Sequence, residues 1–470
     1  MKRFLLIACI TLAILVLSVG LVWLRLRADK PERLIARLES AKGTERQDIL
    51  LRLSLSRGDV IATLLHAFDR AAAPAFRAEL LDLALKRNLR EPDERVESLV
   101  RKALTDKAAE PRRAAAYGLV AYGNPKQQLA LADAVRDADP PVRRHAYALF
   151  ASGGYGPNNR GAFGLLPAEQ LTNLIAACVE KMKTETDPEM AFLARSVVGR
   201  EITIRCEEAA QALLSADVSK AKALIEGALV LDPENQQAQV RLARLYLATG
   251  DSTAAVAAAR QYAALIETPR LSKAPVIDGD PSDEVWREGY TTERFYHTTS
   301  TYVAKPTTGK SRCHVGHRDG MIYVAMLGFE DDLDQLVVKH KDRDGDIWFD
   351  DCVELIFSPD CSEKDFIQFI INPAGTVMDQ RSGDKTANFK CEHKAGVFKE
   401  RGYWAVEFAI EAKELTPTPV TTGTVWAVNF FRARIGAASE HSCIWPMYGY
   451  ALRPGLYPLA IFKDAPGRGD

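Results

Sequence analysis

The stretch GDIWFDDCVELIF, from Gly345 to Phe357, joins a tryptophan and several carboxylates to an apolar run that alternates as a β-strand does. If the strand begins at Asp351, its side chains divide between two faces. One face carries Val353, Leu355 and Phe357, and the other carries Cys352, Glu354 and Ile356. The first face is wholly apolar, so we expect it to line the core of a sandwich. Trp348 precedes the strand and should project from a loop at the edge of the second face.

The sequence around this stretch indicates many short strands. Beyond Thr268 and Pro269 the alanine-rich helical periodicity stops, and Trp, Phe, Tyr, Val, Gly and Thr become frequent. Strand-like segments follow, each bounded by Gly, Pro, Asn or Asp: SRCHVGHRDGMIYVAMLGF, DFIQFIINPAG, GYWAVEFAI, VWAVNFFRARI and GLYPLAIF. Such a series of short strands is typical of two packed sheets. We therefore predict an all-β sandwich over residues 271–463.

Five motifs of this region occur in a recognisable order. They are PVIDGDPSDEVWREG (Pro275 to Gly289), IWFDDCVELIF, FIQFIINPAG, YWAVEFAI and WAVNFFRARI. With these motifs the region 271–463 resembles family 9 carbohydrate-binding modules. The resemblance implies a β-sandwich that binds sugars without cleaving them, and a structural calcium ion is an option in such domains.

Trp348 and Glu354 match ligand-contacting residues of that family, so the resemblance implies the same roles here. The chemistry agrees, because an aromatic ring stacks on the apolar face of a sugar and a carboxylate accepts hydrogen bonds from its hydroxyl groups. The alternative is a capped strand with the tryptophan buried. Two positions depart from the family: Ile370 stands in place of a binding arginine, and Tyr448 and Tyr450 are the nearest aromatics to its second tryptophan.

Several other residues are candidate sugar contacts. Arg432 and Arg434 fall on one side of a predicted strand, where their charges need acids or an anionic ligand to balance them. We expect an internal salt network, with Glu354 and Asp351 as partners if these are near; otherwise an acidic glycan would serve. The remaining candidates are Asp351, Tyr450, Asn372 and Gln368.

The sequence also has candidate residues for two further ligands, calcium and haem. Asp342, Asp344 and Asp346 offer alternating oxygens in one loop and form a candidate calcium site, although a solvated acidic loop has the same pattern. Haem-binding electron-transfer domains are related sandwiches, which hold haem through methionine and histidine. The residues of those types here are Met378, Met447, His393 and His441.

The region before the sandwich is rich in Ala, Leu and Arg and reads as amphipathic helices with short breaks. RDADPPVRRHAYALFASGG (Arg136 to Gly154) and DKAAEPRRAAAYGLVAYGN share one plan, and their spacing predicts stacked helix pairs that resemble HEAT repeats over 31–200. The stretch from Ala221 to Ile266 resembles tetratricopeptide repeats, which we expect over 201–267. The expected role is a spacer or a surface for docking another protein.

An uncharged apolar run from Phe4 to Leu24 follows Lys2 and Arg3. At about 1.5 Å per helical residue it spans about 30 Å, enough to cross the core of a bilayer. The run ends without the small-residue pattern of a cleavage site, and Trp23 suits a membrane interface. We expect an uncleaved signal anchor over 1–27, and hence a single-pass membrane protein whose C-terminal domains lie outside the cytoplasm.

The composition and the absence of certain motifs argue against some classes of function. Hydrophobic residues make up 47% of the chain and charged residues 26%, with a formal net charge of -1. This balance argues against a nucleic-acid partner for the whole chain. No G-x-S-x-G, H-E-x-x-H or phosphate-loop motif occurs in the sequence, and we expect no enzymatic activity.

The predicted fold is multidomain: an N-terminal transmembrane helix, an all-α helical-repeat solenoid and a C-terminal all-β sandwich. The function expected from it is membrane-anchored, non-catalytic carbohydrate binding at the cell envelope, with the helical repeats as an arm. A haem-binding electron-transfer domain and a purely structural assembly protein are the alternatives.

Overall fold

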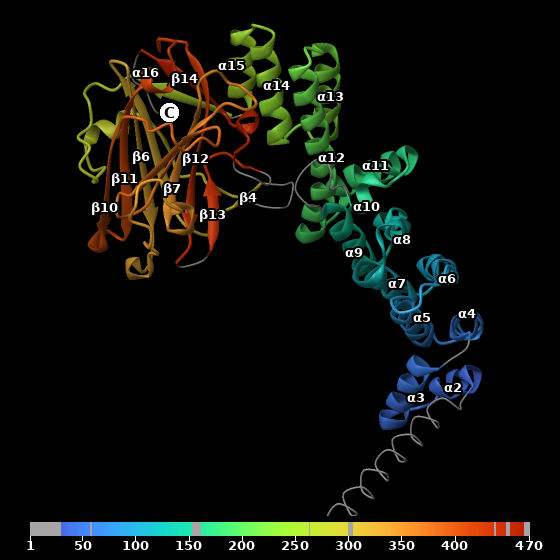
Figure 1. Cartoon of the computed structure of the whole chain (residues 1–470). Coiled ribbons are helices and arrows are strands. Elements are labelled where there is room, and N and C mark those ends of the chain that lie inside the picture. The colour runs from blue at the N-terminus through green and yellow to red at the C-terminus, as the bar shows by residue number, and fades with distance from the viewer. Residues whose placement is uncertain are drawn as a thin grey trace, which may run out of the picture. The chain divides into compact units, whose positions relative to one another are not determined.

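The computed structural model describes most of the chain, and the described residues fall into two compact units. The described ranges are 30–56, 59–152, 161–262, 264–298, 304–436, 439–447 and 452–464. Helices make up the first unit, which ends at Leu193, and the second unit runs mainly from Ala194 with helices followed by strands (Figure 1). A helical region followed by an all-β region is the order that the sequence predicted.

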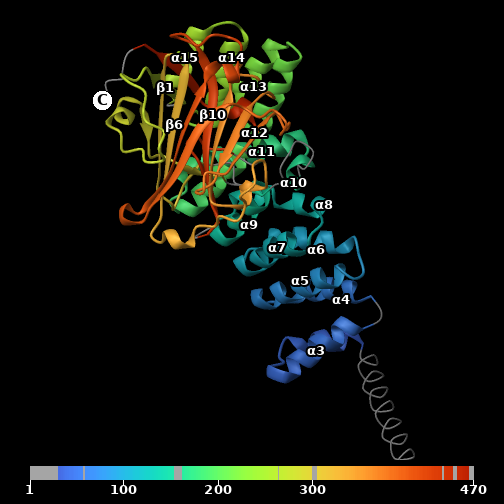
Figure 2. The same ribbon diagram turned by 60° about the vertical axis from the view of Figure 1, so that its left-hand side comes forward.

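Short helices form the first unit and lie in stacked pairs, which Figure 2 shows from α3 to α9. They are α2 (Pro31–Leu38), α3 (Gly43–Leu55), α4 (Val60–Arg70), α5 (Pro74–Asn88), α6 (Arg95–Leu104), α7 (Ala109–Tyr122), α8 (Pro125–Gln128), η1 (Leu129–Leu131), η2 (Asp133–Arg136), α9 (Pro140–Ala151), α10 (Gly161–Gly164), α11 (Ala168–Thr184) and the start of α12 (Pro188–Leu214). Proline opens several of them because its missing N–H is not needed in the first turn. Asp59 caps α4 by accepting from the backbone N–H of Ala62 at 3.0 Å.

One arginine contact recurs along this stack. The fourth residue of α3, α5, α7 and α9 is an arginine, namely Arg46, Arg77, Arg112 and Arg143. Each donates Nη1 to two carbonyl oxygens just before its own helix and forms an ion pair with a carboxylate further along the chain. For Arg112 the carbonyls are those of Asp106 (2.9 Å) and Lys107 (3.2 Å), and the carboxylate is that of Asp137 (2.8 and 2.9 Å). The recurrence shows that four successive pairs are joined in the same way.

Replacing Arg112 by alanine should loosen the stack locally. The change removes four hydrogen bonds from a mostly buried guanidinium and leaves the Asp137 carboxylate without its cation. Each bond to a charged group contributes about 1.5–3 kcal/mol at most, so amide hydrogen exchange in α7 and α9 should accelerate by at least about fivefold. Arg101→Ala, which breaks only an exposed ion pair with Glu97 on α6, is the matched control. Equal exchange in the two variants would contradict a structural role for the recurring contact.

The second unit begins with the remainder of α12, followed by α13 (Val218–Leu231), α14 (Gln236–Ala248) and α15 (Ser252–Gln261). Each of the last three is capped by a side chain that accepts from the first turn: Asp217, Asn235 and Asp251. Leucines and alanines of α12 to α14 pack together, as an amphipathic helical pattern predicts. No family of repeats follows from this packing alone, so the HEAT-like and tetratricopeptide-like assignments stay predictions.

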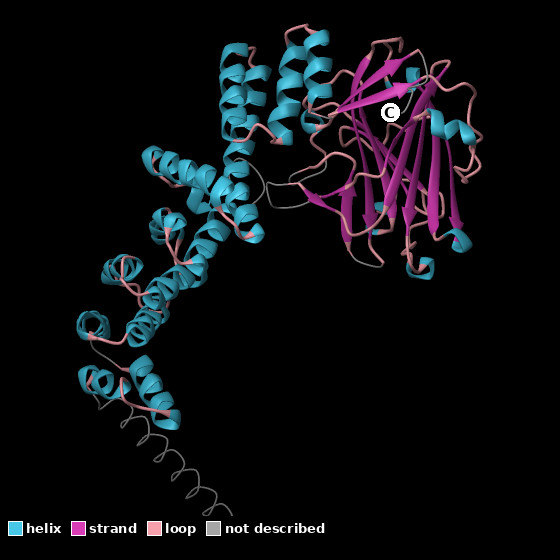
Figure 3. Ribbon diagram, turned by 180° about the vertical axis from the view of Figure 1, so that it is seen from behind, coloured by secondary structure: helices cyan, strands magenta, loops and turns pink. Residues whose placement is uncertain are grey.

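Two sheets packed face to face form the rest of the second unit, which confirms the predicted β-sandwich (Figure 3). The larger sheet has the order β4-β3-β13-β12-β7-β8-β9, with β14 beside β12 and β1 beside β14; the smaller sheet has the order β10-β11-β6-β5-β2. The strands are β1 (Leu265–Pro269), β2 (Tyr290–Thr292), β3 (Tyr296–His297), β4 (Lys305–Pro306), β5 (Ser311–Arg318), β6 (Met321–Phe329), β7 (Cys352–Ser358), β8 (Ile367–Ile371), β9 (Val377–Arg381), β10 (Cys391–Phe398), β11 (Tyr403–Glu411), β12 (Val425–Arg434), β13 (Glu440–Cys443) and β14 (Leu459–Lys463). Single helical turns interrupt them: η3 (Glu284–Glu288), η4 (Leu333–Gln335), η5 (Ile347–Phe349), η6 (Lys399–Arg401), α16 (Ala412–Leu415) and η7 (Pro454–Leu456).

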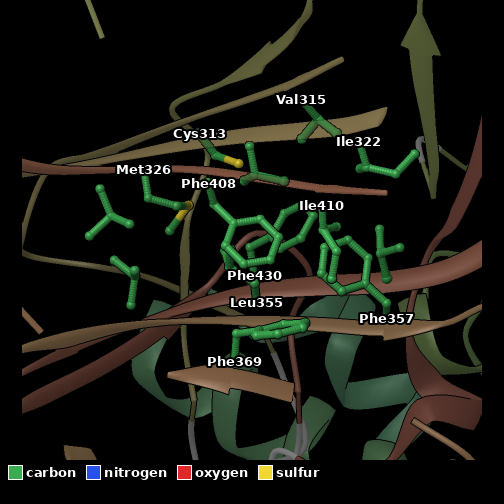
Figure 4. Packing of buried hydrophobic residues seen from close by; sticks show 14 of the residues in the cluster. Cys313, Val315, Ile322, Met326, Leu355, Phe357, Phe369, Phe408, Ile410 and Phe430 are labelled. Atoms are coloured by element: carbon green, nitrogen blue, oxygen red, sulfur yellow. The ribbon is translucent and has the colours of Figure 1, made fainter. Parts of the chain in front are cut away.

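The core between the sheets contains the face of β7 that the sequence assigned to it. Leu355 and Phe357 point into a cluster of aromatic and aliphatic side chains drawn from both sheets (Figure 4). Phe369 of β8 and Phe408 of β11 meet there with ring centroids 4.8 Å apart. The cluster spans the two sheets, so it fixes which face of each strand turns inward.

The sandwich begins earlier than the sequence predicted. Residues 264–267 were assigned to the end of the tetratricopeptide-like region, but α15 ends at Gln261 and β1 pairs in parallel with β14. The side chain of Ile266 enters the core of the sandwich, which explains why the helical pattern stops before it. The strand therefore connects the last helix directly to the larger sheet.

The helices α14 and α15 cover part of the larger sheet. Small side chains of the two helices pack against large ones of the sheet and its loops. The helical members are Val240, Ala243, Ala255, Ala258 and Ala259, and the others include Ile356, Phe366, Phe431, Trp445, Leu456 and Tyr457. Polar contacts frame this interface: Arg241 forms an ion pair with Glu363, and Arg453 forms one with Glu207 at 2.6 Å. The helices and the sandwich thus share one apolar core.

The described helices include none that is long and apolar enough to cross a membrane. Even α12, at 27 residues, carries charged side chains such as Arg195 and Glu201 along its length. The segment expected to span the membrane, Phe4 to Leu24 within residues 1–27, lies outside the described residues. The described residues therefore give the predicted transmembrane helix and single-pass membrane location no support, and neither is carried further.

Candidate functional site

Two aromatic rings stand at the start of β7. Trp348 lies in the single turn η5 and is half-buried, packed against a small cluster that includes Cys352, Ile370 and Met378. Phe349 follows it with 60% of its surface exposed, and the two ring centroids are 5.9 Å apart. The cluster lies on the face of the larger sheet that carries Cys352 and Glu354, which we call the outer face. The alternation of β7 starts after Phe349, so no sequence pattern singled out this second ring.

Glu354 lies on the outer face between Phe431 of β12 and Ile370 of β8. It is half-buried, and Gln368 donates Nε2 to its carboxylate at 2.7 Å. Gln380 of β9 in turn donates to Gln368, which makes a short polar row across three strands. Burial raises the pKa of Glu354 to about 7, although the bond from Gln368 acts in the opposite direction. Its immediate neighbours Cys352 and Ile370 also contact the Trp348 cluster, so the ring and the carboxylate share one end of the outer face.

Replacing Glu354 by glutamine should stabilise the protein in alkaline solution. A glutamate whose pKa rises from 4.5 to about 7 on folding binds its proton more tightly when folded, so stability is full below pH 4.5 and falls as pH rises to 7. Glutamine keeps an acceptor for Gln368 but has no charge to bury. We expect a gain of roughly 1–3 kcal/mol in the free energy of unfolding at pH 8 and none at pH 4, measured by urea unfolding. Glu392→Gln, at an exposed site of β10, should change stability at neither pH.

Asp351 does not join Glu354. It is buried on the other side of the strand, where it accepts from the backbone N–H groups of Val337 (2.7 Å), Ile435 (3.1 Å) and Gly436 (3.2 Å). Burial raises the pKa of Asp351 more than these bonds lower it. The carboxylate holds two loops against the start of β7, and this use of all its acceptor directions leaves it away from the outer face.

Asn372 is also committed to the backbone. It is fully buried, donates Nδ2 to His340 O (2.9 Å) and to Asp350 (3.1 Å), and accepts from Ala374 N and Thr376 N. Burial acts to raise the pKa of Asp350, but bonds from His340, Lys339 and Asn372 outweigh it and hold that pKa below its ordinary value. Asn372 therefore shapes the loop before β7 and does not reach the aromatic pair.

Arg432 and Arg434 do form an internal salt network, but with a partner that the sequence did not suggest. Arg432 pairs in register with Val353 and so faces inward, opposite to the outer face. Both guanidinium groups bind Glu330, at the end of β6, and Arg434 does so through Nε (2.8 and 2.9 Å) and Nη2 (2.7 Å). Glu354 and Asp351 as the balancing acids are therefore wrong, because strand alternation puts Glu354 on the opposite face and Asp351 is held by backbone N–H groups.

The remaining candidates that the structure describes do not gather at the site. Tyr450 lies outside the described residues, as does Tyr448. In the acidic loop, Asp344 accepts from Asp379 N at 3.3 Å, and Asp342 and Asp346 are exposed. Within the ranges that the structure describes, no group of three or more His, Cys, Asp or Glu side chains is placed to hold a metal ion. The calcium site therefore stays a prediction.

The four residues of haem-ligand type are scattered. Met378 is buried in the outer-face cluster with Trp348, and Met447 is buried under α14 and α15. His393 lies on β10 in the other sheet, with Nε2 3.1 Å from Gly375 O, and His441 lies on β13. Strand register puts Met378 and His441 on the same face of the larger sheet, but β8, β7 and β12 lie between their strands. A single haem could not reach both, so the structure gives the haem alternative no support.

Comparison with known proteins gives matches among solved structures alone. No family model matches the chain, and no curated protein does. A family 9 carbohydrate-binding module from Caldicellulosiruptor kristjanssonii in complex with glucose is 15% identical, with 44% of this chain and 98% of that chain covered and a TM-score of 0.33. The cellotriose complex of such a module from the same organism gives the same identity and TM-score with 97% of that chain covered. A protein from Bacteroides uniformis described as a candidate carbohydrate-binding protein is 13% identical, with 42% of this chain and 97% of that chain covered and a TM-score of 0.32. At these scores the function has to be argued from the site itself.

Proposed function

We propose that the sandwich binds a carbohydrate at the Trp348 end of the outer face. The observation that carries the proposal is a half-buried indole beside an exposed phenyl ring, on the same face of the sheet as the carboxylate of Glu354 on β7. The rings of Trp348 and Phe349 supply apolar planes for a pyranose, and Glu354 supplies a carboxylate that can bond its hydroxyl groups. The sequence motifs that resemble sugar-binding modules point to the same two residues, Trp348 and Glu354.

The proposed activity is binding without cleavage. A glycosidase needs two carboxyl groups on either side of one glycosidic bond, about 5–10 Å apart. The two acids of β7 cannot take these places, because Glu354 lies on the outer face and Asp351 is buried on the opposite side under three backbone N–H groups. The site therefore offers one carboxylate to a sugar, as a polar anchor.

The helices limit the size of the proposed site. Ile356, two positions beyond Glu354 on the same face, is already covered by α14 and α15. Alternate residues of a strand are roughly 6.8 Å apart, which is close to the length of one sugar ring. The sugar surface therefore extends from Glu354 towards Trp348, and we expect a few rings of a glycan to be bound there.

Removing the indole tests the proposal directly. Trp348→Ala should reduce glycan binding by about two- to tenfold, because an aromatic contact of this kind contributes roughly 0.5–1.5 kcal/mol. The measurement is a glycan array followed by calorimetry on the best ligand. Phe398→Ala is the matched control: this ring is also half-buried and contacts the guanidinium of Arg401, 4.1 Å from its centroid, but it belongs to the other sheet. An equal loss in both variants would mean that binding depends on stability of the fold and not on Trp348.

A further inference from the structure

A lysine occupies the face of the proposed stacking ring. Lys385 lies in the turn that follows β9, and its Nζ stands 4.3 Å from the centroid of the Trp348 ring. Such a cation over an indole is favourable by itself. A neutral sugar that stacks on this face has to move the ammonium group aside, so Lys385 forms part of whatever the ring recognises.

The ammonium group of Lys385 has no acid to balance it. Among the described residues, no carboxylate lies within ion-pairing distance of its Nζ. The acid next to it in the chain, Asp384, is turned to its own loop and accepts from Thr386 N (2.9 Å) and Oγ1 (2.7 Å). The nearby guanidinium of Arg343 is different, since it is bound to both oxygens of Asp379 at 2.8 Å. Lys385 is thus the free positive charge at the ring.

We infer that the site selects a sugar that bears a carboxylate, such as a hexuronate, and that Lys385 is the residue that makes this choice. The inference rests on the proposed function and deepens it. When a sugar stacks on Trp348, the displaced ammonium group finds its partner in the sugar carboxylate, whereas a neutral sugar offers none. Charge-assisted hydrogen bonds are shorter and stronger than those of neutral groups, so the same lysine opposes one ligand and favours the other.

The carboxylate of Glu354 is compatible with an anionic ligand. Burial raises its pKa to about 7, so part of the population is uncharged near neutrality and can donate a hydrogen bond. The charged and titratable neighbours of this group are Cys352 on its own strand and Cys443 on β13, both buried thiols whose pKa values burial raises. Glu354 therefore repels an anionic ligand less than a fully ionised carboxylate would.

The experiment uses the full chain and matched pairs of sugars. Oligosaccharides containing glucuronate or galacturonate are compared by calorimetry with their carboxyl-reduced forms, which keep the ring stereochemistry and lose the charge. The unmodified protein should bind the acidic form about five- to tenfold more tightly. Lys385→Gln should abolish this preference, with binding of the neutral form equal or tighter, and Lys385→Arg should retain it. Lys394→Gln, at an exposed lysine of β10, is the control and should behave as the unmodified protein.

The outcomes separate the inference from the proposed function. Equal affinity for the acidic and reduced forms, or a preference that survives in Lys385→Gln, would overturn the role of Lys385 while leaving sugar binding in place. No binding of any sugar in either form, by the unmodified protein, would overturn both. A preference that vanishes with Lys385→Gln and is also lost with Trp348→Ala supports both.

Discussion

Replacing Glu330 by glutamine is expected to destabilise the sandwich by about 3–5 kcal/mol, the usual cost of removing one partner from a buried ion pair. Glu330 joins two arginines, and the side chain of Arg432 is 1% exposed. Glutamine cannot neutralise the two positive charges, and Arg432 has its other bonds only to Lys310 O (2.7 Å), Ser311 Oγ (3.1 Å) and Phe329 O. The charge of a buried guanidinium would then have no counterion.

Urea unfolding followed by tryptophan fluorescence checks this, because every tryptophan except Trp23 lies in the sandwich. Glu293→Gln is the matched control, since Glu293 also pairs with an arginine, Arg312, but both side chains are exposed. That pair should contribute less than about 1 kcal/mol. Similar unfolding midpoints for the two variants would show that the Glu330 network contributes no more than a surface pair.

A fragment that begins at β1, residues 264–464, is expected to lose the cooperative fold, while residues 188–464 retain it. The shorter fragment lacks α14 and α15 and uncovers the large side chains beneath them, each of which contributes about 1.5–3 kcal/mol when buried. These side chains include Ile356, Phe366, Phe431, Trp445, Leu456 and Tyr457. It would also remove Arg241, the ion-pair partner of Glu363.

The two fragments can be compared by dye binding to exposed apolar surface and by the sharpness of thermal unfolding. Only the shorter fragment should bind the dye and unfold over a broad range. A cooperative transition in residues 264–464 equal to that of the longer fragment would contradict a shared core. The comparison also decides which fragment is suitable for glycan binding, since the binding face and the helix-covered face are parts of one sheet.

The fold of the sandwich could be predicted from the sequence because strand alternation has a period of two. The alternation placed Val353, Leu355 and Phe357 inward and Glu354 outward, as the structure has them. Local hydrogen bonds and packing also hold the Pro275 to Gly289 motif in place. Trp286 packs in a small core and donates to Glu407 at 2.8 Å, and Asp283 accepts from Val276 N, so the Pro275 to Gly289 motif is a brace on the sheet.

Contacts between residues far apart in the sequence could not be predicted in this way. Glu330 and Arg432 are 102 positions apart, and nothing in either local pattern links them. Lys385 belongs to a turn whose path over Trp348 depends on how β9 leaves the sheet. The burial of Asp351 and Asn372 follows from loops that fold back on them, so their polarity suggested ligand contacts where the structure uses them for the backbone.

The alanines of α14 and α15 have a consequence for how this chain can vary in length. In a row of stacked helices, the last helix has an apolar face that no further helix covers. A capping element with a polar outer face must cover it. Here β14, Leu456 and Tyr457 cover the apolar face of the last helices. Additional helices inserted after Gln261 would separate two surfaces that fit each other, whereas insertions between earlier pairs would leave this junction intact. Growth or shortening of the helical region is thus expected upstream of α14, never at its junction with the sheet.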